Sequence, residues 1–302
     1  MIDATVEARH GHRLLVLTDD GRSLIAVMRG RKSDVTVGDR VSIGELGAGQ
    51  AVIEKVQPRR NLIQRSDAWK AKSQAANIDQ AAVVIAPSPP FSDDLLSRVM
   101  IEASTQNVTV ALLVNKSDLG PQRAAIEPRI VLYKSLGYEV FECSAKTDPE
   151  GTVARLAPWL AGRTTLLLGQ SGMGKSTLVN CLIPNAGLRT QEISTALDAG
   201  RHTTTFTRLF DLPAPLSGRI IDSPGFQTFG LEHLSESQRL HAMPECQALL
   251  GQCRFHSCTH RDEPGCAIRA AVKDGRIDER RYSLLLKLHE ETRVNAPASW
   301  RR

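Results

Sequence analysis

The stretch LLLGQSGMGKSTLVN, Leu166 to Asn180, decides the fold of the central part of this chain. It carries the pattern G-x-x-x-x-G-K-[ST] between an apolar strand and a helical run. In that setting backbone N–H groups wrap phosphates, Lys175 reaches the β- and γ-phosphates, and the Ser176 hydroxyl ligates Mg²⁺. The alternative is a glycine turn that binds nothing. The predicted phosphate-binding residues are Gly169, Gln170, Ser171, Gly172, Met173, Gly174, Lys175, Ser176 and Thr177.

A second stretch, LLVNKSDLG from Leu112 to Gly120, predicts which base is bound. It places N-K-x-D at the end of an apolar strand, where α/β sheets expose ligand-contacting loops. A carboxylate there accepts from the two N–H donors on the guanine edge, which adenine lacks. N-K-x-D also occurs in plain turns, but S-A-K after the next strand matches a loop that donates to guanine O6. The predicted guanine-binding residues are Asn115, Lys116, Asp118, Ser144, Ala145 and Lys146.

A third motif, DSPG from Asp222 to Gly225, follows the strand RII and matches D-x-x-G. Asp222 would hold Mg²⁺ through water and the Gly225 N–H would sense the γ-phosphate; the alternative is a Pro-Gly turn. The base-reading motifs precede the phosphate loop, the reverse of an ordinary small GTPase. Cutting and rejoining the chain elsewhere leaves the sheet intact, so the order predicts a circularly permuted GTPase. The segment after Asp222 then leads directly into the C-terminal part.

The residue that activates the attacking water is harder to predict. Ras-like enzymes use a glutamine directly after D-x-x-G, but Phe226 stands there. The run GRHTTT, Gly200 to Thr205, lies where switch I belongs, and it offers His202 to position water and Arg201 to neutralise phosphate charge. A solvated loop histidine is the alternative. The predicted catalytic residues are His202 and Lys175, and the predicted Mg²⁺ ligands are Ser176, Thr204, Thr205 and Asp222, the choice of threonine being open.

The flanking sequence predicts a multidomain α/β chain. Short alternating runs between Arg13 and Val56 predict a small β-barrel. The polar, basic stretch Pro58 to Gln74 reads as a linker. Apolar strands alternating with amphipathic helices from Ala75 predict a buried parallel sheet. The predicted domains are a barrel over 1–66, a GTPase domain over 67–228 and a helical metal-binding domain over 229–302.

Four of the six cysteines lie within the twenty-one residues from Cys246 to Cys266. In a chain without a secretory signal such crowding indicates a metal site rather than disulfides. Cys246 is a possible ligand, but its helical surroundings favour a buried thiol, and ordinary reduced cysteines are the alternative to any metal. The predicted ligands of one closed, structural Zn²⁺ site are Cys253, Cys258, His260 and Cys266.

Composition gives weaker indications. No apolar run approaches the length of a membrane span, so we expect a cytoplasmic protein without membrane contact. The net charge of +5 comes from the flanks, with 12 Lys/Arg against 9 Asp/Glu in residues 1–70, 14 against 14 in 71–225 and 12 against 10 in 226–302. Flanks that touch RNA would give this distribution, but many proteins that never meet nucleic acid share it.

The motifs GQSGMGKST, GRHTTT, DSPGF and CRFHSCTHRDEPGC, in this order after a small barrel, resemble the RsgA (YjeQ) family over nearly the whole chain. The resemblance implies an OB-fold barrel and a zinc domain that grip ribosomal RNA. It also implies a GTPase that the small ribosomal subunit stimulates and that acts late in the maturation of that subunit. Gly172 disfavours the permuted GTPases that carry asparagine there and are associated with potassium.

The expected partners are therefore GTP or GDP and the small ribosomal subunit with its RNA, and we expect a monomer. The barrel is poor in aromatic residues, so its RNA contacts would rely on basic side chains, unless these form a solvated face. The candidates are Arg29, Arg31, Lys32, Arg59 and Arg60. The alternative function is a GTP-dependent RNA- or protein-binding switch whose hydrolysis is incidental, as Phe226 would allow.

Overall fold

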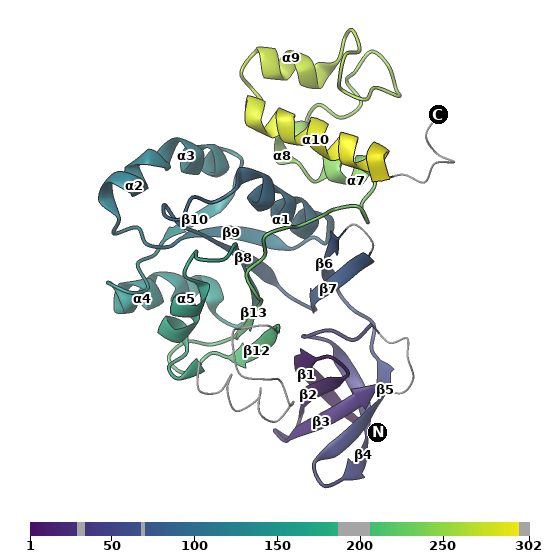
Figure 1. The fold of residues 1–302 in the computed structure, drawn as a ribbon, viewed down its shortest axis with the longest axis vertical. Helices are drawn as coiled ribbons and strands as arrows, with labels where there is room; N and C mark the ends of the chain where they lie inside the picture. Colours follow the sequence, from purple (N-terminus) through teal and green to yellow (C-terminus); the bar gives the residue numbers. More distant parts are fainter. Residues whose placement is uncertain (29–33, 68–69, 187–205, 296–302) are drawn as a thin grey trace.

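The computed structural model describes residues 1–28, 34–67, 70–186 and 206–295. Figure 1 shows a β-barrel with the N-terminus at one end, an α/β layer in the middle, and a helical part at the opposite end. The barrel, the circularly permuted GTPase layer and the helical C-terminal part were all predicted from the sequence.

The barrel contains β1 (Ile2–His10), β2 (Arg13–Thr18), β3 (Ser23–Met28), β4 (Arg40–Gly47) and β5 (Gln50–Val56). The strands follow the order β1-β2-β3-β5-β4, and β4 closes the barrel by pairing with β1. The sequence pattern began at Arg13 and missed β1. Ala4, Val6 and Ala8 point into the core of the molecule, and two of the three are alanines, which give a weak apolar signal.

The stretch Pro58 to Gln74 was predicted to be a linker, and that prediction was wrong. Residues Leu62–Asp67 (β6) and Lys70–Ala76 (β7) form an antiparallel hairpin. Its strands are mostly polar, and their buried apolar residues, Ile63, Ala75 and Ala76, do not alternate regularly along the sequence, which explains the misreading. The predicted boundary at residue 66 lies inside β6, and the division into 1–66, 67–228 and 229–302 remains a proposal.

The central sheet is mostly parallel, in the order β10-β9-β8-β11-β13-β12. Its strands are β8 (Gln80–Ile85), β9 (Thr109–Val114), β10 (Glu139–Glu142), β11 (Thr164–Leu168), β12 (Arg208–Asp211) and β13 (Arg219–Asp222). Its helices are α1 (Asp93–Thr105), α2 (Gly120–Ala125), α3 (Glu127–Ser135), α4 (Pro149–Leu160) and α5 (Lys175–Leu182). Figure 1 shows α1, α2 and α3 on one side of the sheet and α4 and α5 on the other.

The barrel and the central sheet are continuous through β12, which the sequence pattern also missed. β12 pairs antiparallel with β13 on one side and with β1, through Ala8 and Arg208, on the other. The Arg208 side chain is buried and its guanidinium lies 4.3 Å from the ring centroid of Phe210. Near this junction, burial and the charge of Asp211 together raise the pKa of Glu7 to about 6, although Arg208 acts in the opposite direction.

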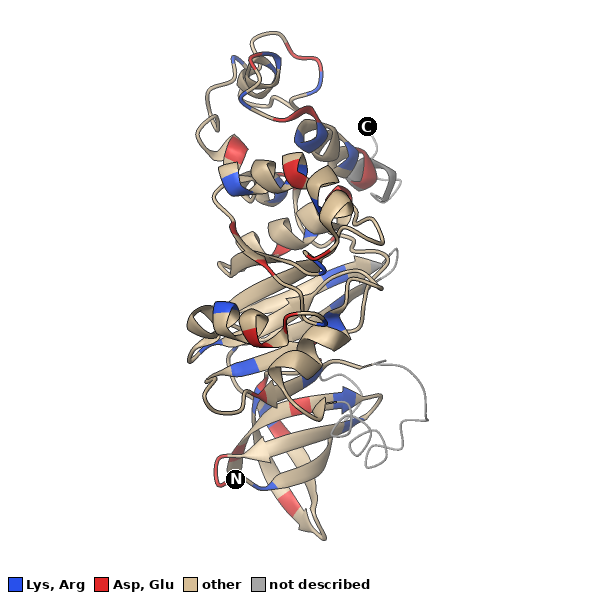
Figure 2. Cartoon of the chain, turned by 90° about the vertical axis from the view of Figure 1, so that its left-hand side faces the viewer, with Lys and Arg blue, Asp and Glu red and all other residues tan. Residues whose placement is uncertain are grey.

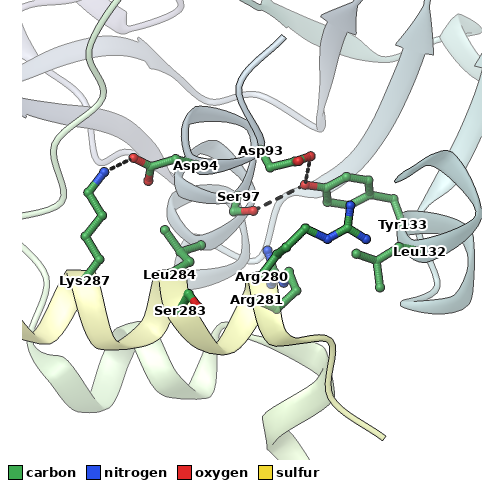
Figure 3. A pocket seen from close by; sticks show the side chains of 10 residues that line it. All are labelled: Asp93, Asp94, Ser97, Leu132, Tyr133, Arg280, Arg281, Ser283, Leu284 and Lys287. Carbon is green, nitrogen blue, oxygen red and sulfur yellow. Dashed lines mark hydrogen bonds and ion pairs between the residues drawn. The ribbon is translucent and has the colours of Figure 1, made fainter. Parts of the chain in front are cut away.

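The C-terminal part contains α7 (Glu236–His241), α8 (Pro244–Gln247), α9 (Ala267–Lys273) and α10 (Glu279–Asn295). Helix α10 lies across α1. The buried Arg98 of α1 donates to both carboxylate oxygens of Glu291 at 2.9 and 2.6 Å. Next to it a cavity of about 180 Å³ lies between α1, α3 and α10, where Lys287 pairs with Asp94 (Figure 3).

No helix in the described ranges has the length and apolar character needed to cross a lipid bilayer.

Candidate nucleotide and metal sites

The phosphate loop joins the fully buried strand β11 to helix α5, and its glycines are required by the backbone. Gly174 has φ 88° directly before Lys175, the first residue of α5. Gly169 has φ 150°, and a Cβ there would lie 2.5 Å from the carbonyl oxygen of Val84. A side chain at either position would be strained, so the loop conformation depends on these residues. The hydroxyl-bearing Ser176 and Thr177 are exposed at the start of α5.

Lys175 is buried against the loop that it would serve. Its Nζ donates to the carbonyl oxygens of Gly169 at 2.8 Å and Gln170 at 3.2 Å. Burial lowers the pKa of Lys175, while the charge of Asp222 opposes this change. Burial raises the pKa of Asp222 to about 6 even though the charge of Lys175 acts in the opposite direction. This desolvated pair of opposite charges suits the oxygens of a triphosphate and a divalent cation.

The N-K-x-D loop is tied to the phosphate loop by side chains. The buried Asn115 donates through Nδ2 to the carbonyl oxygen of Met173 at 3.1 Å and accepts through Oδ1 from the Ala145 N–H at 3.2 Å. Lys116, with φ 59°, donates through Nζ to the Gly172 carbonyl oxygen at 2.9 Å. The structure therefore joins three loops that are far apart in sequence. Asp118 is exposed, as a residue that pairs with a base must be.

The S-A-K loop lies beside Asn115. The Ala145 N–H already donates to the Asn115 side chain, and the Ser144 N–H donates to the Thr152 hydroxyl at 3.1 Å. Lys146 is exposed. The loop thus lies beside the N-K-x-D loop, and guanine O6 would share or replace one of these internal bonds.

The loop after β8 was missed by the sequence analysis. Ser88 accepts from Lys116 Nζ at 2.7 Å, and the Ser92 N–H donates to Gln170 Oε1 at 2.6 Å. A Cβ on Gly172 would lie 3.0 Å from Pro89. A signal existed, because this loop leaves the carboxyl end of a buried parallel strand, the edge at which the other motifs lie.

The D-x-x-G segment lies against the phosphate loop. A Cβ on Gly225 would lie 3.1 Å from both Lys175 Nζ and the backbone nitrogen of Ser171. The Phe226 N–H donates to the Gly169 carbonyl oxygen at 3.4 Å. The Phe226 ring is buried and packs edge-on against Phe229, with centroids 5.4 Å apart. Phe226 therefore has a packing role and offers no group that orients water.

The switch residues predicted from GRHTTT lie outside the described residues. They are Arg201, His202, Thr204 and Thr205.

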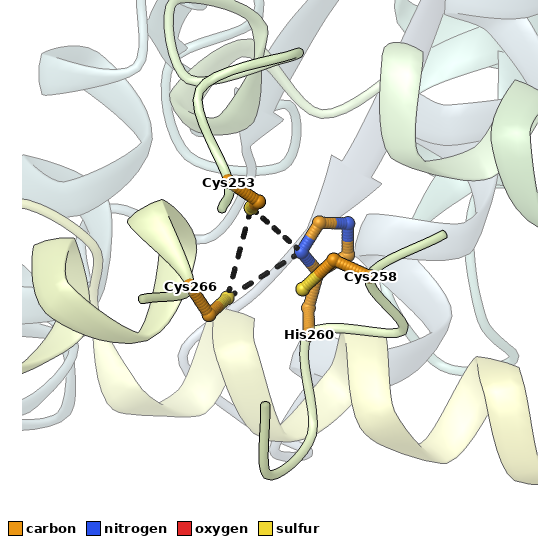
Figure 4. A group of neighbouring side chains, drawn as sticks. All are labelled: Cys253, Cys258, His260 and Cys266. Carbon is orange, nitrogen blue, oxygen red and sulfur yellow. Dashed lines mark hydrogen bonds between the residues drawn. The ribbon is translucent and has the colours of Figure 1, made fainter. Parts of the chain in front are cut away.

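The predicted zinc ligands come together in the C-terminal part (Figure 4). The donor atoms of Cys253, Cys258, His260 and Cys266 all lie within 4.8 Å of one another. Cys253 Sγ is 3.6 Å from His260 Nδ1 and 3.9 Å from Cys266 Sγ, and Cys266 Sγ is 3.5 Å from Nδ1. The edge of a tetrahedron with ordinary Zn–S bonds is about 3.8 Å. The donor set therefore fits a tetrahedral metal ion.

The surroundings of the cluster also suit a metal. Backbone N–H groups of Ala267 and Arg269 donate to the sulfurs of Cys253 and Cys266 at 3.4 and 3.5 Å, contacts that favour thiolates. Burial lowers the pKa of His260, which favours the neutral imidazole that binds metals. Cys246 lies elsewhere in the core, where burial raises its thiol pKa to about 12, in agreement with the predicted buried thiol.

The basic candidates of the barrel have internal partners where they are described. Arg59 pairs with the buried Asp39 at 2.7 Å, and Arg60 pairs with Asp79 at 2.8 Å while remaining largely exposed. Arg29, Arg31 and Lys32 lie outside the described ranges. Figure 2 shows basic and acidic residues mixed along the length of the molecule.

The fold and the phosphate, base and D-x-x-G loops define a circularly permuted P-loop GTPase, which hydrolyses GTP to GDP and phosphate. A sequence model described as RsgA GTPase matches residues 56–232. The chain belongs to the RsgA GTPase family.

Known proteins match this chain over nearly its full length. The chain is 49% identical to the "Small ribosomal subunit biogenesis GTPase RsgA" of Paraburkholderia phytofirmans, covering 97% of this chain and 94% of that protein. The protein of the same name from Burkholderia pseudomallei is 49% identical over 96% of this chain and 92% of its own. The structure of YjeQ from Thermotoga maritima has a TM-score of 0.73 at 27% identity, covering 96% of this chain and 98% of that one. YloQ, described as a circularly permuted GTPase, shares the fold with a TM-score of 0.69 at 24% identity, over 98% of this chain and 96% of its own.

Proposed function

We propose that this GTPase binds the small ribosomal subunit and hydrolyses GTP during late maturation of that subunit. The bound subunit stimulates GTP turnover. The observation that carries the proposal is the 49% identity, over 97% of the chain, to a relative named for small-subunit biogenesis. We also propose that the protein is cytoplasmic and that it is a monomer.

In the proposed reaction, water attacks the γ-phosphorus of GTP and GDP leaves. Lys175 would exchange its two carbonyl partners for β- and γ-phosphate oxygens, which carry more negative charge. Gly225 lies close enough to Lys175 and Ser171 for its N–H to reach the γ-phosphate. Asp118 would select guanine. We keep His202 as the group that positions the water, because Phe226 cannot.

The metal ions have separate roles in this proposal. Mg²⁺ held by Ser176, Asp222 and either Thr204 or Thr205 would neutralise charge on the phosphate oxygens. Zn²⁺ held by the four-residue cluster would have no open position for water and would stabilise the fold of the C-terminal part.

A second candidate function is a GTP-dependent switch whose hydrolysis is incidental. The observation that favours it is the buried ring of Phe226, which occupies the place of a water-orienting side chain. Stimulation of turnover by a ribosomal particle separates the two candidates.

The test is GTP hydrolysis by the full chain alone, with purified small ribosomal subunits, and with large subunits as the control. We expect stimulation by small subunits alone. Equal turnover in all three samples, with GTP still bound, would favour the switch, and stimulation by both particles would contradict the assigned partner.

A further inference from the structure

The segment from Phe226 to Leu234 connects the D-x-x-G motif to the C-terminal part and is fixed at two places. At its start, the Phe226 N–H donates to the Gly169 carbonyl oxygen at 3.4 Å, and Phe226 and Gln170 form an isolated parallel β-bridge. Phe229, Leu231 and Leu234 are buried along its length. A displacement of the segment near Gly230 would therefore move Gly225, which directly precedes the segment.

At its middle, the segment pairs with the hairpin that leads out of the barrel. Ser66 of β6 and Gly230 exchange two backbone hydrogen bonds, of 2.9 and 3.2 Å. A Cβ on Gly230 would lie 2.7 Å from the Ser66 carbonyl oxygen, so this close approach depends on glycine.

A buried side-chain network reinforces this pairing. His233 Nδ1 lies 2.8 Å from Ser66 Oγ, and His233 Nε2 lies 2.8 Å from Glu102 Oε2 of α1. The other Glu102 oxygen accepts from the Gln64 N–H of β6 at 2.7 Å. The Glu102 side chain is fully buried, and a buried polar network whose members are all bonded holds one geometry. We call these three side chains the Ser66–His233–Glu102 network.

The same hairpin also holds the barrel. The Ala76 N–H donates to the Val37 carbonyl oxygen at 2.9 Å, and Asn77 Nδ2 donates to the Gly38 carbonyl oxygen at 2.9 Å. The Gly38 N–H in turn donates to the Val6 carbonyl oxygen of β1 at 2.9 Å. Hydrogen bonds therefore run from the barrel wall, through the hairpin, to the segment that begins at Phe226.

We propose that the Ser66–His233–Glu102 network couples the position of the barrel to the position of Gly225, so that seating the barrel on the partner sets the rate of GTP turnover. The proposal rests on the proposed function, because it assigns to the barrel the contact with the stimulating particle. If barrel seating changes the site around Gly225, nucleotide binding and barrel seating affect each other's free energy reciprocally, so we expect the bound nucleotide to change the barrel end of the hairpin. Ser66, His233 and Glu102 are positioning residues.

The first test needs no ribosome. Amide hydrogen exchange is measured for the full chain with GDP and with a non-hydrolysable GTP analogue, on peptides that contain Gly38 and Ala76. We expect exchange to differ between the two nucleotides in the wild type and in the control His241→Ala, an exposed histidine of α7. In Ser66→Ala and His233→Ala we expect that difference to disappear. A wild type without the difference, or variants that keep it, would overturn the coupling.

The second test uses turnover with small ribosomal subunits. Basal kcat and KM should stay near wild type in Ser66→Ala, while the stimulation factor falls at least ~5-fold, the lower end of ordinary coupling. An equal loss of basal and stimulated rates would mean that these residues shape the site itself, and would also overturn the proposal. Should His233→Ala fail to fold, Ser66→Ala, which removes one hydroxyl, carries both tests. A wild type that no subunit stimulates contradicts the proposed function, and the exchange experiment then decides the coupling separately.

Discussion

The backbone of the phosphate loop holds the Lys175 side chain in a position suited to binding a phosphate. Its ammonium is desolvated and donates to two carbonyl oxygens of the loop that would wrap the phosphates. Carbonyl oxygens carry partial charge, so phosphate oxygens would be the better partners. The side chain therefore needs little movement to bind a nucleotide.

We predict that Lys175→Ala lowers GTP turnover at least ~100-fold, because it removes a positive charge placed where charge develops in the transition state. The fold should survive, since the substitution also removes a costly buried charge. Phosphate release and thermal unfolding measure the two effects. The control is Lys134→Ala, on the exposed side of α3; normal turnover in Lys175→Ala would refute the phosphate-loop assignment.

Among the structural elements, the junction of β1 with β12 carries a partly buried carboxyl group, that of Glu7. Burial and the nearby Asp211 raise the pKa of Glu7 to about 6, while Arg208 acts in the opposite direction. From about pH 4.5 to 6 the folded chain keeps a proton that the unfolded chain has lost. Stability must therefore fall as pH rises through this range.

We predict that Glu7→Gln, which cannot ionise, is more stable than the wild type by about 1–2 kcal/mol at pH 7.5, because the pKa of Glu7 is raised to about 6 in the folded chain. The advantage should vanish below about pH 4.5, where both side chains are neutral. Thermal unfolding at the two pH values measures it, with the exposed Glu139→Gln as control. An advantage that does not change with pH would exclude this cause.

The cysteine cluster is a second element whose stability depends on few groups. It lies between short helices, and a segment of this size has little core of its own. We predict about one Zn²⁺ per chain, lost in Cys258→Ser together with protection of the C-terminal amides. Metal analysis and hydrogen exchange measure both. Cys181→Ser, outside the cluster, should keep the metal; a folded, metal-free wild type would contradict the site.

The ligand loops could be predicted because each is a contiguous motif whose spacing is dictated by a phosphate, a base or a metal. The strand β1 could not, because its inward positions include small alanines, and the polar hairpin β6–β7 has no apolar alternation. The Ser66–His233–Glu102 network lay beyond sequence reasoning, since His233 is 131 residues from Glu102 and 167 from Ser66. Contacts of that separation are set by packing, which no local pattern records.

In the molecule as a whole, the helical part shares a hydrophobic core with the GTPase layer and is also joined to it by charged side chains. Arg98 of α1 lies between Asp94 and Glu291, with its own side chain 6% exposed. A bidentate ion pair that is largely buried is stronger than an exposed ion pair.

We predict that Glu291→Ala lowers the free energy of unfolding by about 1–3 kcal/mol, because Arg98 loses a partner while remaining buried. Denaturant unfolding measures the loss, and faster amide exchange in α10 should locate it. The neighbouring Glu290→Ala removes a more exposed carboxylate, 57% accessible, and should change stability little. Equal losses of stability in the two variants would argue against a specific contribution from the Arg98–Glu291 ion pair.

The position of β13 has a consequence for how the chain is made. Among the described strands it is the last in sequence, yet it lies between β11 and β12. Synthesis runs from the N-terminus, so the barrel and the strands β8 to β11 emerge before β12. When β12 emerges, its partner strand β1 has already been made. Until residues 219–222 leave the ribosome, the edges of β11 and β12 that pair with β13 in the complete sheet have no partner strand. The strand that ends in Asp222 thus completes the sheet and delivers a proposed magnesium ligand in the same step, so a chain truncated before it would have neither.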